Sequence, residues 1–131
     1  MLELNTMLDT FLVPEKTVVT AKGDGAVVDI SAAKNRDLLL ILTISNIVEQ
    51  ESIDISVWGS GDGQTWTTKP LASFPQKFYT GKRPLLLSLS SQPDIKFLRA
   101  HWEVNRWGRG SESPMFEFSL RATEVAPDML K

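Results

Sequence analysis

Few residues in this sequence have the type and spacing that catalysis requires. His101 is the only histidine, and Glu103 follows two positions later, so the two side chains would share one face of a strand. A His-x-Glu pair is common on exposed strands, and no glycine-rich phosphate loop, nucleophile elbow or His-Glu-x-x-His motif accompanies it. We therefore predict a non-catalytic protein with no catalytic residues and no cofactor.

Metal binding is disfavoured as well. The chain has one histidine and no cysteine, which excludes thiolate zinc sites, disulfides and cysteine nucleophiles. Asp24, Asp54 and Asp62 could supply oxygen ligands for calcium, but they lack the dense acidic spacing of calcium loops. We predict no metal site and interpret these aspartates as parts of turns.

A ligand or partner contact is predicted around Trp107. Residues 105–110 are polar and glycine-rich, and an aromatic ring there can stack on a sugar or anchor a partner protein. The alternative is that the ring folds back over the end of the domain. Residues 96–110 hold four basic residues and one acidic residue, which makes a mild positive patch. The candidate binding residues are Trp107, Arg106, Arg109, His101 and Arg99.

The elements that must position these residues are strands. Apolar and polar residues alternate strictly in 53–57, 98–104 and 116–122, which is typical of half-buried strands. Further strands are expected at 7–13, 17–21, 26–30, 36–45 and 85–89. About eight or nine short strands separated by turns predict an all-β fold, a single antiparallel β-sandwich of jelly-roll type.

The chain is long enough for one domain. We assign residues 1–14 to an N-terminal strand or arm, 15–125 to the sandwich and 126–131 to a short tail. Residues 2–12 could also place their apolar side chains on one face of a helix. The β-branched residues beside Pro14 favour the extended conformation.

The most specific local motif is a hairpin formed by Ser60, Asp62, Gly63 and Trp66. Asp62 can accept backbone N–H bonds across the turn, and Gly63 can adopt a positive φ. Trp66 would then begin the return strand and pack its ring on the hairpin.

This Ser-x-Asp-Gly-x-x-Trp pattern resembles the central hairpin of discoidin-type (coagulation factor 5/8 C-domain) modules and other galactose-binding-like sandwiches, including small phage and prophage proteins. Residues 96–100 resemble a late strand of the same modules, but residues 117–121 depart from their closing strand and the terminal cysteines are missing. The resemblance implies a sandwich fold, and no ligand residue carries over from it.

Two leucine-rich runs indicate a second covered surface. Residues 38–42 and 85–87 are apolar without interruption, although one side of a sandwich sheet normally faces water. We predict that Leu39, Ile41 and Leu86 form an assembly face, covered with residues 1–14 between subunits of a homo-oligomer or larger protein assembly. The competing account is that residues 1–14 fold back over their own domain.

Charge and hydropathy exclude several partners. The net charge of −2 argues against nucleic acid, and the longest strongly apolar run, 38–42, is far shorter than the ~20 residues that span a bilayer. The start of the chain lacks the features of a signal peptide, so we expect synthesis in the cytoplasm and no membrane partner. Two functions remain open: a structural or interaction protein that self-assembles or docks onto a larger complex, such as a phage-like virion, or a carbohydrate-binding module of discoidin-like type that holds a glycan.

Overall fold

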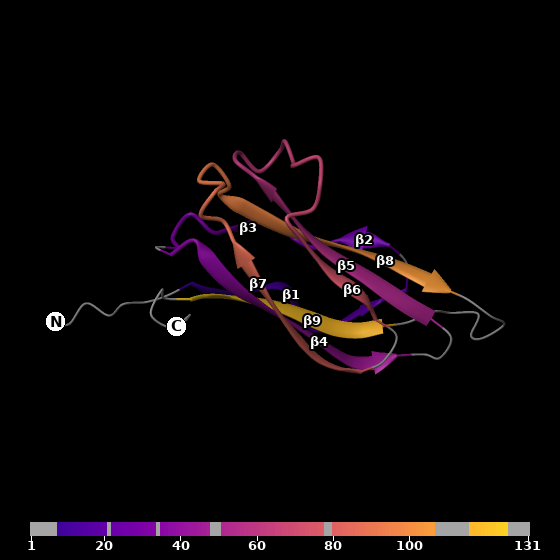
Figure 1. The fold of residues 1–131 in the computed structure, drawn as a ribbon. Helices are drawn as coiled ribbons and strands as arrows, with labels where there is room; N and C mark the ends of the chain where they lie inside the picture. The colour runs from indigo at the N-terminus through magenta and orange to yellow at the C-terminus, as the bar shows by residue number, and fades with distance from the viewer. Residues whose placement is uncertain are drawn as a thin grey trace.

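The computed structural model describes residues 8–20, 22–33, 35–47, 51–77, 80–106 and 116–125. Within these ranges the chain forms nine strands and no helix, so the predicted all-β class is confirmed (Figure 1). The strands are β1 (Asp9–Val19), β2 (Gly23–Asp24), β3 (Val28–Asp29), β4 (Asp37–Ile47), β5 (Glu51–Ser60), β6 (Ala72–Lys77), β7 (Gly81–Ser88), β8 (Phe97–Arg106) and β9 (Phe116–Glu124). In the part of the chain described, no helix is long and apolar enough to cross a membrane.

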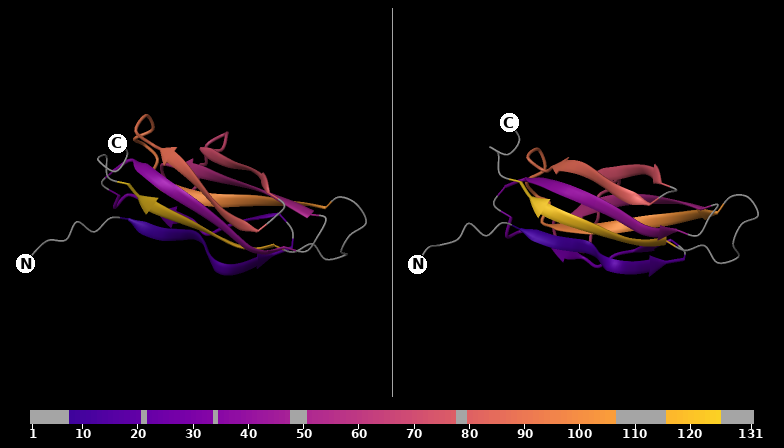
Figure 2. Two further views of the ribbon diagram at one scale, coloured as in Figure 1. Left: turned by 60° about the horizontal axis from the view of Figure 1, so that its bottom comes forward. Right: turned by 90° about the horizontal axis from the view of Figure 1, so that it is seen from below.

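The strands form two antiparallel sheets that pack as a sandwich. Sheet A has the order β1-β9-β4-β7, and sheet B has the order β2-β8-β5-β6, with β3 also paired to β8. Figure 2 shows the strands of sheet A side by side, with sheet B as a second layer behind them. Most neighbours within a sheet are distant in sequence, so the sandwich is held together by non-local pairing.

The core lies between the two sheets and is built from every second residue of the long strands. Trp102 of β8 and Phe118 of β9 meet there, with ring centroids 5.6 Å apart and ring planes at 78°. This edge-to-face contact joins the two layers. The largest side chains below 2% exposure are all apolar: Phe116, Phe118, Leu12, Ile30, Leu38, Leu40, Leu42, Ile53, Ile55, Leu89, Leu98 and Leu120.

Strand β1 continues through Pro14. The two predicted segments, 7–13 and 17–21, are therefore largely one strand, which pairs with β9 and has register shifts between Phe11 and Thr17. Lys16, with φ 63°, lies in this bulge. A proline removes a backbone donor, and β1 tolerates it because the strand is at the edge of sheet A. Residues 9–14 of the predicted arm thus belong to the sandwich of their own chain, while 1–7 and 126–131 lie outside the described residues.

Candidate functional site

The predicted hairpin turn forms after β5. Asp62 Oδ1 accepts hydrogen bonds from the backbone N–H groups of Gln64 and Thr65, both at 2.8 Å. These bonds, and a third from the Ser60 hydroxyl, hold the pKa of Asp62 below its usual value. Gly63 has φ 83°, as predicted. The return strand differs from the prediction, because Trp66 makes only a single bridge to Ser60 and β6 begins later, at Ala72.

Gly63→Ala should lower the free energy of unfolding by about 1 kcal/mol, because a side chain is strained at this positive φ. Space is not the cause, since an added Cβ would lie 3.7 Å from the Phe97 ring. Urea denaturation measures the loss. Gly63→Asn is the matched control and should cost less, because asparagine tolerates the left-handed region better than alanine. An alanine variant with the wild-type midpoint would contradict the argument.

The turn positions Trp66 against Arg99 of β8. The guanidinium carbon of Arg99 lies 4.3 Å from the Trp66 ring centroid, a cation–π contact. The Nε of Arg99 is 3.9 Å from Asp24 Oδ1, and this buried N–H has no hydrogen-bond partner among the described residues. Arg99 is therefore held between the Trp66 ring and the Asp24 carboxylate.

His101 links two carboxylates on the same side of sheet B. Its Nδ1 is 2.8 Å from Asp24 Oδ1, and its Nε2 is 3.1 Å from Glu103 Oε2. Carboxylates only accept hydrogen bonds, so both contacts are satisfied only by the doubly protonated imidazolium. Partial burial lowers the pKa of His101, but the hydrogen bonds to Glu103 and Asp24 outweigh it and the pKa is raised. The imidazolium ring thus bridges the carboxylates of Asp24 and Glu103.

Trp58 completes this arrangement from the neighbouring strand. It is directly paired with Arg99, and Ser56 is directly paired with His101, so strands β5 and β8 present these side chains together. The indole N–H of Trp58 donates a 2.9 Å hydrogen bond to Ser56 Oγ. This bond restricts the orientation of the ring, which stays partly exposed.

Two hollows meet at Trp58 and His101. One, of about 250 Å³, is lined by Asp24, Trp58, Trp66, Thr67, Arg99 and His101. The other, of about 310 Å³, runs between β5, β6 and β8 and adds polar groups from Asp54, Ser56, Ser73 and Glu103. Together these residues define the tryptophan groove.

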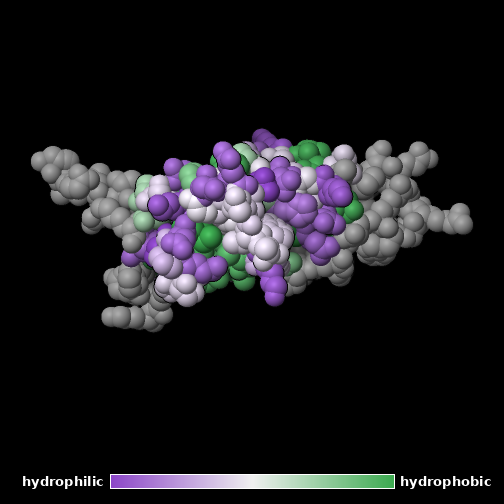
Figure 3. Space-filling view, turned by 90° about the horizontal axis from the view of Figure 1, so that it is seen from above, coloured by the Kyte–Doolittle hydropathy of each residue, from purple (hydrophilic) through white to green (hydrophobic). Residues whose placement is uncertain are grey.

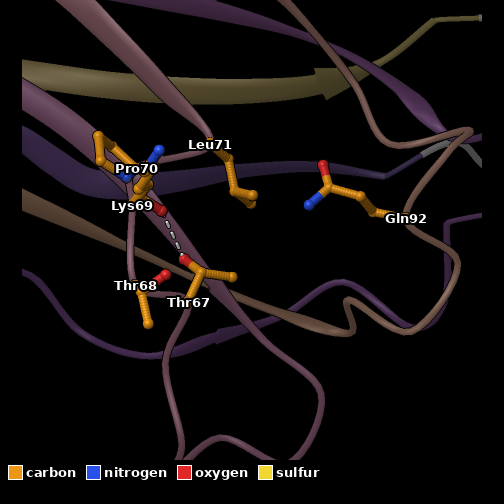
Figure 4. A pocket seen from close by; sticks show the side chains of 6 residues that line it. All are labelled: Thr67, Thr68, Lys69, Pro70, Leu71 and Gln92. Carbon is orange, nitrogen blue, oxygen red and sulfur yellow. Dashed lines mark hydrogen bonds between the residues drawn. The ribbon is translucent and has the colours of Figure 1, made fainter.

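A third hollow adjoins the groove at Thr67. Figure 4 shows its lining, in which the Thr67 hydroxyl donates a 2.8 Å hydrogen bond to the Lys69 carbonyl. It measures about 450 Å³ and is lined by loop residues without an aromatic ring, so we treat it as separate from the tryptophan groove. The surrounding surface, seen from the sheet B side, is mostly hydrophilic with small apolar areas (Figure 3).

Only part of the predicted binding set lies in this groove. Arg99 and His101 belong to it, whereas Trp107 and Arg109 lie outside the described residues and only the backbone of Arg106, at the end of β8, is described. The groove also contains Trp58, which the sequence analysis did not select. The alternation in 53–57 could have identified it, because Trp58 follows the buried Val57 and must therefore face away from the core.

The predicted turn role holds for only one of the three aspartates. Asp62 is in the hairpin turn, but Asp24 lies in β2 and Asp54 in β5. Asp24 is paired with His101, so the strand register places its carboxylate in the groove. Within the described ranges, no group of three or more histidine and acidic side chains is arranged to hold a metal ion.

The groove has the features of a ligand site. Trp58 and Trp66 are partly exposed in it, the Arg99 Nε–H lacks a hydrogen-bond partner within the part of the chain described, and carboxylates flank the His101 ring. Its aromatic rings offer flat apolar surfaces, and its polar atoms offer both hydrogen-bond donors and acceptors. In comparisons with known proteins, no family model matches this chain and no curated protein matches it.

Proposed function

We propose that this protein is a non-catalytic carbohydrate-binding domain that holds a neutral saccharide in the tryptophan groove. The observation that carries the proposal is the placement of Trp58 among hydrogen-bonding side chains, with Arg99 directly across on β8 and His101 across from Ser56, two residues away. A sugar ring has an apolar C–H face and an equatorial rim of hydroxyl groups, so it needs this combination of a flat ring and surrounding polar atoms. Of the two functions that the sequence leaves open, this one rests on a defined hollow.

Stacking on Trp58 supplies the apolar part of recognition. A tryptophan presents a large rigid surface at a low cost in conformational entropy. Its indole N–H is already bonded to Ser56, so the ring is oriented before a ligand arrives. Trp66 offers less surface because the Arg99 guanidinium lies over its ring, and we expect it to contact the sugar at an edge.

Hydrogen bonding supplies orientation. The carboxylates of Asp24 and Glu103 are about half exposed and accept hydrogen bonds, and sugar hydroxyl groups donate them. The Arg99 side chain, which is 31% exposed, lines the same hollow, and its guanidinium N–H groups can donate hydrogen bonds to sugar oxygens. The groove therefore presents both donors and acceptors beside the aromatic surface.

The charge of the groove favours a neutral ligand. Its lining contains three carboxylates, Asp24, Asp54 and Glu103, against two cations, Arg99 and protonated His101. The balance is negative, so carboxylated or sulfated saccharides are repelled while hydroxyl groups are not.

The geometry around His101 also supports a role without catalysis. A general base needs an unprotonated nitrogen within reach of the substrate proton. Both ring nitrogens of His101 are instead engaged by carboxylates, and its pKa is raised. The imidazole thus stabilises the groove, and we assign it a positioning role.

An array of neutral and anionic oligosaccharides, followed by calorimetry with a soluble monovalent hit, tests the proposal. We expect binding among the neutral saccharides, and Trp58→Ala should weaken it by roughly tenfold or more, since loss of a stacking ring costs at least about 1.4 kcal/mol. Trp58→Phe should retain part of the affinity, because it keeps an aromatic face.

Leu86→Ala is the matched control, because Leu86 is an exposed apolar residue of the other sheet and should not affect binding. Circular dichroism confirms that each variant is folded. Preference for anionic saccharides, absence of any neutral hit, or wild-type affinity in Trp58→Ala would each overturn the proposal.

A further inference from the structure

The outer face of sheet A is apolar across its middle. Leu38, Leu40 and Leu42 of β4 point into the core, so Leu39 and Ile41 point away from it. The next strand adds Leu86, which is 47% exposed, and β1 adds Phe11, which is 38% exposed. The structure therefore places the predicted Leu39, Ile41 and Leu86 on one outward surface, which we call the sheet A face.

Strand register arranges this face in rows that cross the sheet. One row runs Phe11, Arg121, Ile41, Pro84, from the β1 edge to the β7 edge. The row beside it runs Asp9, Thr123, Leu39, Leu86. The apolar members of both rows are adjacent, so they form a continuous stripe over β4 and β7.

Charges of opposite sign lie at the two edges of the face. A shallow hollow of about 160 Å³ crosses it, and its lining includes Glu15 from β1 and Lys82 from β7. Lys82 is paired with Thr43, one row beyond Ile41 and Pro84. The hollow is therefore acidic at the β1 edge and basic at the β7 edge.

We propose that two copies of this chain associate through their sheet A faces, about a twofold axis parallel to the strands. Such an axis places β1 over the partner's β7 and β9 over the partner's β4. Glu15 then faces the partner's Lys82, and symmetry makes this contact twice. Phe11 comes to lie over the partner's Pro84, which covers the apolar stripe.

The arrangement of charges selects this axis over the alternative. A twofold axis perpendicular to the strands would place β1 over the partner's β1 and reverse the order of the rows. Asp9, at one side of the Ile41 row, would then approach the partner's Glu15 on the other side. Because Arg121 already balances Asp9, that axis gives Glu15 and Lys82 no opposite charge to pair with, whereas the parallel axis pairs them with each other.

The remaining charges of the stripe are compatible with burial. Arg121 lies in the Phe11 row, and its Nε donates a 2.7 Å hydrogen bond to Asp9 Oδ1 within the same chain. That bond holds the pKa of Asp9 below its usual value, so the pair stays ionised and mutually neutralised. Sheets stack face to face at a spacing of about 10 Å, which side chains of this size fill.

Charge-swap variants examined by sedimentation equilibrium test this arrangement. Both Glu15 and Lys82 are exposed in the monomer, so changing them should leave the fold intact. Glu15→Lys or Lys82→Glu alone replaces two attractive contacts in the dimer with two repulsive ones. We expect each single variant to raise the dimer dissociation constant roughly tenfold or more.

The double variant, Glu15→Lys with Lys82→Glu, restores opposite charges across the interface and should return the dissociation constant to within roughly threefold of wild type. Lys96→Glu makes the same change of charge as Lys82→Glu, but on the exposed turn before β8, and should have no effect. A wild-type protein that stays monomeric at high micromolar concentration, as it would if this face served another partner, overturns the proposal. So does a double variant no tighter than the single variants, or a dimer that neither single change weakens.

Discussion

Glu124→Ala should lower the free energy of unfolding by about 3–5 kcal/mol, because it removes a buried carboxylate and leaves three partly buried donors without their acceptor. The Glu124 side chain is only 2% exposed. Its carboxylate accepts hydrogen bonds from the backbone N–H of Leu8 at 2.9 Å and from the backbone N–H of Asn35 at 2.8 Å. The amide side chain of Asn35 donates a third, at 2.6 Å. These bonds fasten the entry to β1 and the segment before β4 onto the end of β9.

Glu124→Gln separates the hydrogen bonds from the volume of the side chain. Glutamine has nearly the same shape but retains only one acceptor oxygen, so its loss of stability should fall between those of wild type and alanine. Urea denaturation followed by circular dichroism gives all three values. Equal stability of the alanine variant and wild type would show that the hydrogen bonds of the Glu124 carboxylate contribute nothing to the free energy of unfolding.

Phe118→Ala should cost a similar amount, about 3–5 kcal/mol, for a different reason. Phe118 is fully buried, and its ring meets Trp102 edge to face across the sandwich. Removing the ring leaves a cavity between the two sheets and takes away the aromatic contact that joins them. Thermal and chemical denaturation both measure the effect.

Phe118→Leu provides the matched comparison, because it fills much of the space without an aromatic ring. We expect a smaller loss, and tryptophan fluorescence should report the changed surroundings of Trp102 in both variants. If the alanine and leucine variants were equally stable, the cavity would have closed by local collapse and would not account for the loss.

Local sequence pattern predicts the strands of this fold better than their arrangement. The alternation in 53–57, 98–104 and 116–122 marks β5, β8 and β9, because the period of two is a property of each strand alone. Pro14 led to the prediction of two strands in place of one, because a proline at a sheet edge removes one donor without ending the strand. The order β1-β9-β4-β7 depends on pairing between distant residues, which no local window contains.

The same limit applies to the tryptophan groove. Arg99 and His101 are identifiable as outward residues of an alternating strand. Trp58 and Asp24 become their neighbours only through the register of β5 and β2 against β8. Composition favours the basic, glycine-rich segment at 105–110 for ligand contact, whereas strand register assembles the groove earlier in β8, around Arg99 and His101.

The position of β9 between β1 and β4 has a consequence for how the protein folds. The first long strand and the strand it pairs with are separated by nearly the whole described chain, since Asp9 is opposite Thr123. During synthesis, β1 must therefore wait without a strand partner until the nascent chain has delivered β9, and β4 can pair only with β7 until then. Closing so large a loop is slow, and high contact order predicts folding in milliseconds to seconds. Over that interval β1 and the edge of β4 that will pair with β9 have open backbone groups, which makes them the strands of sheet A most exposed to aggregation.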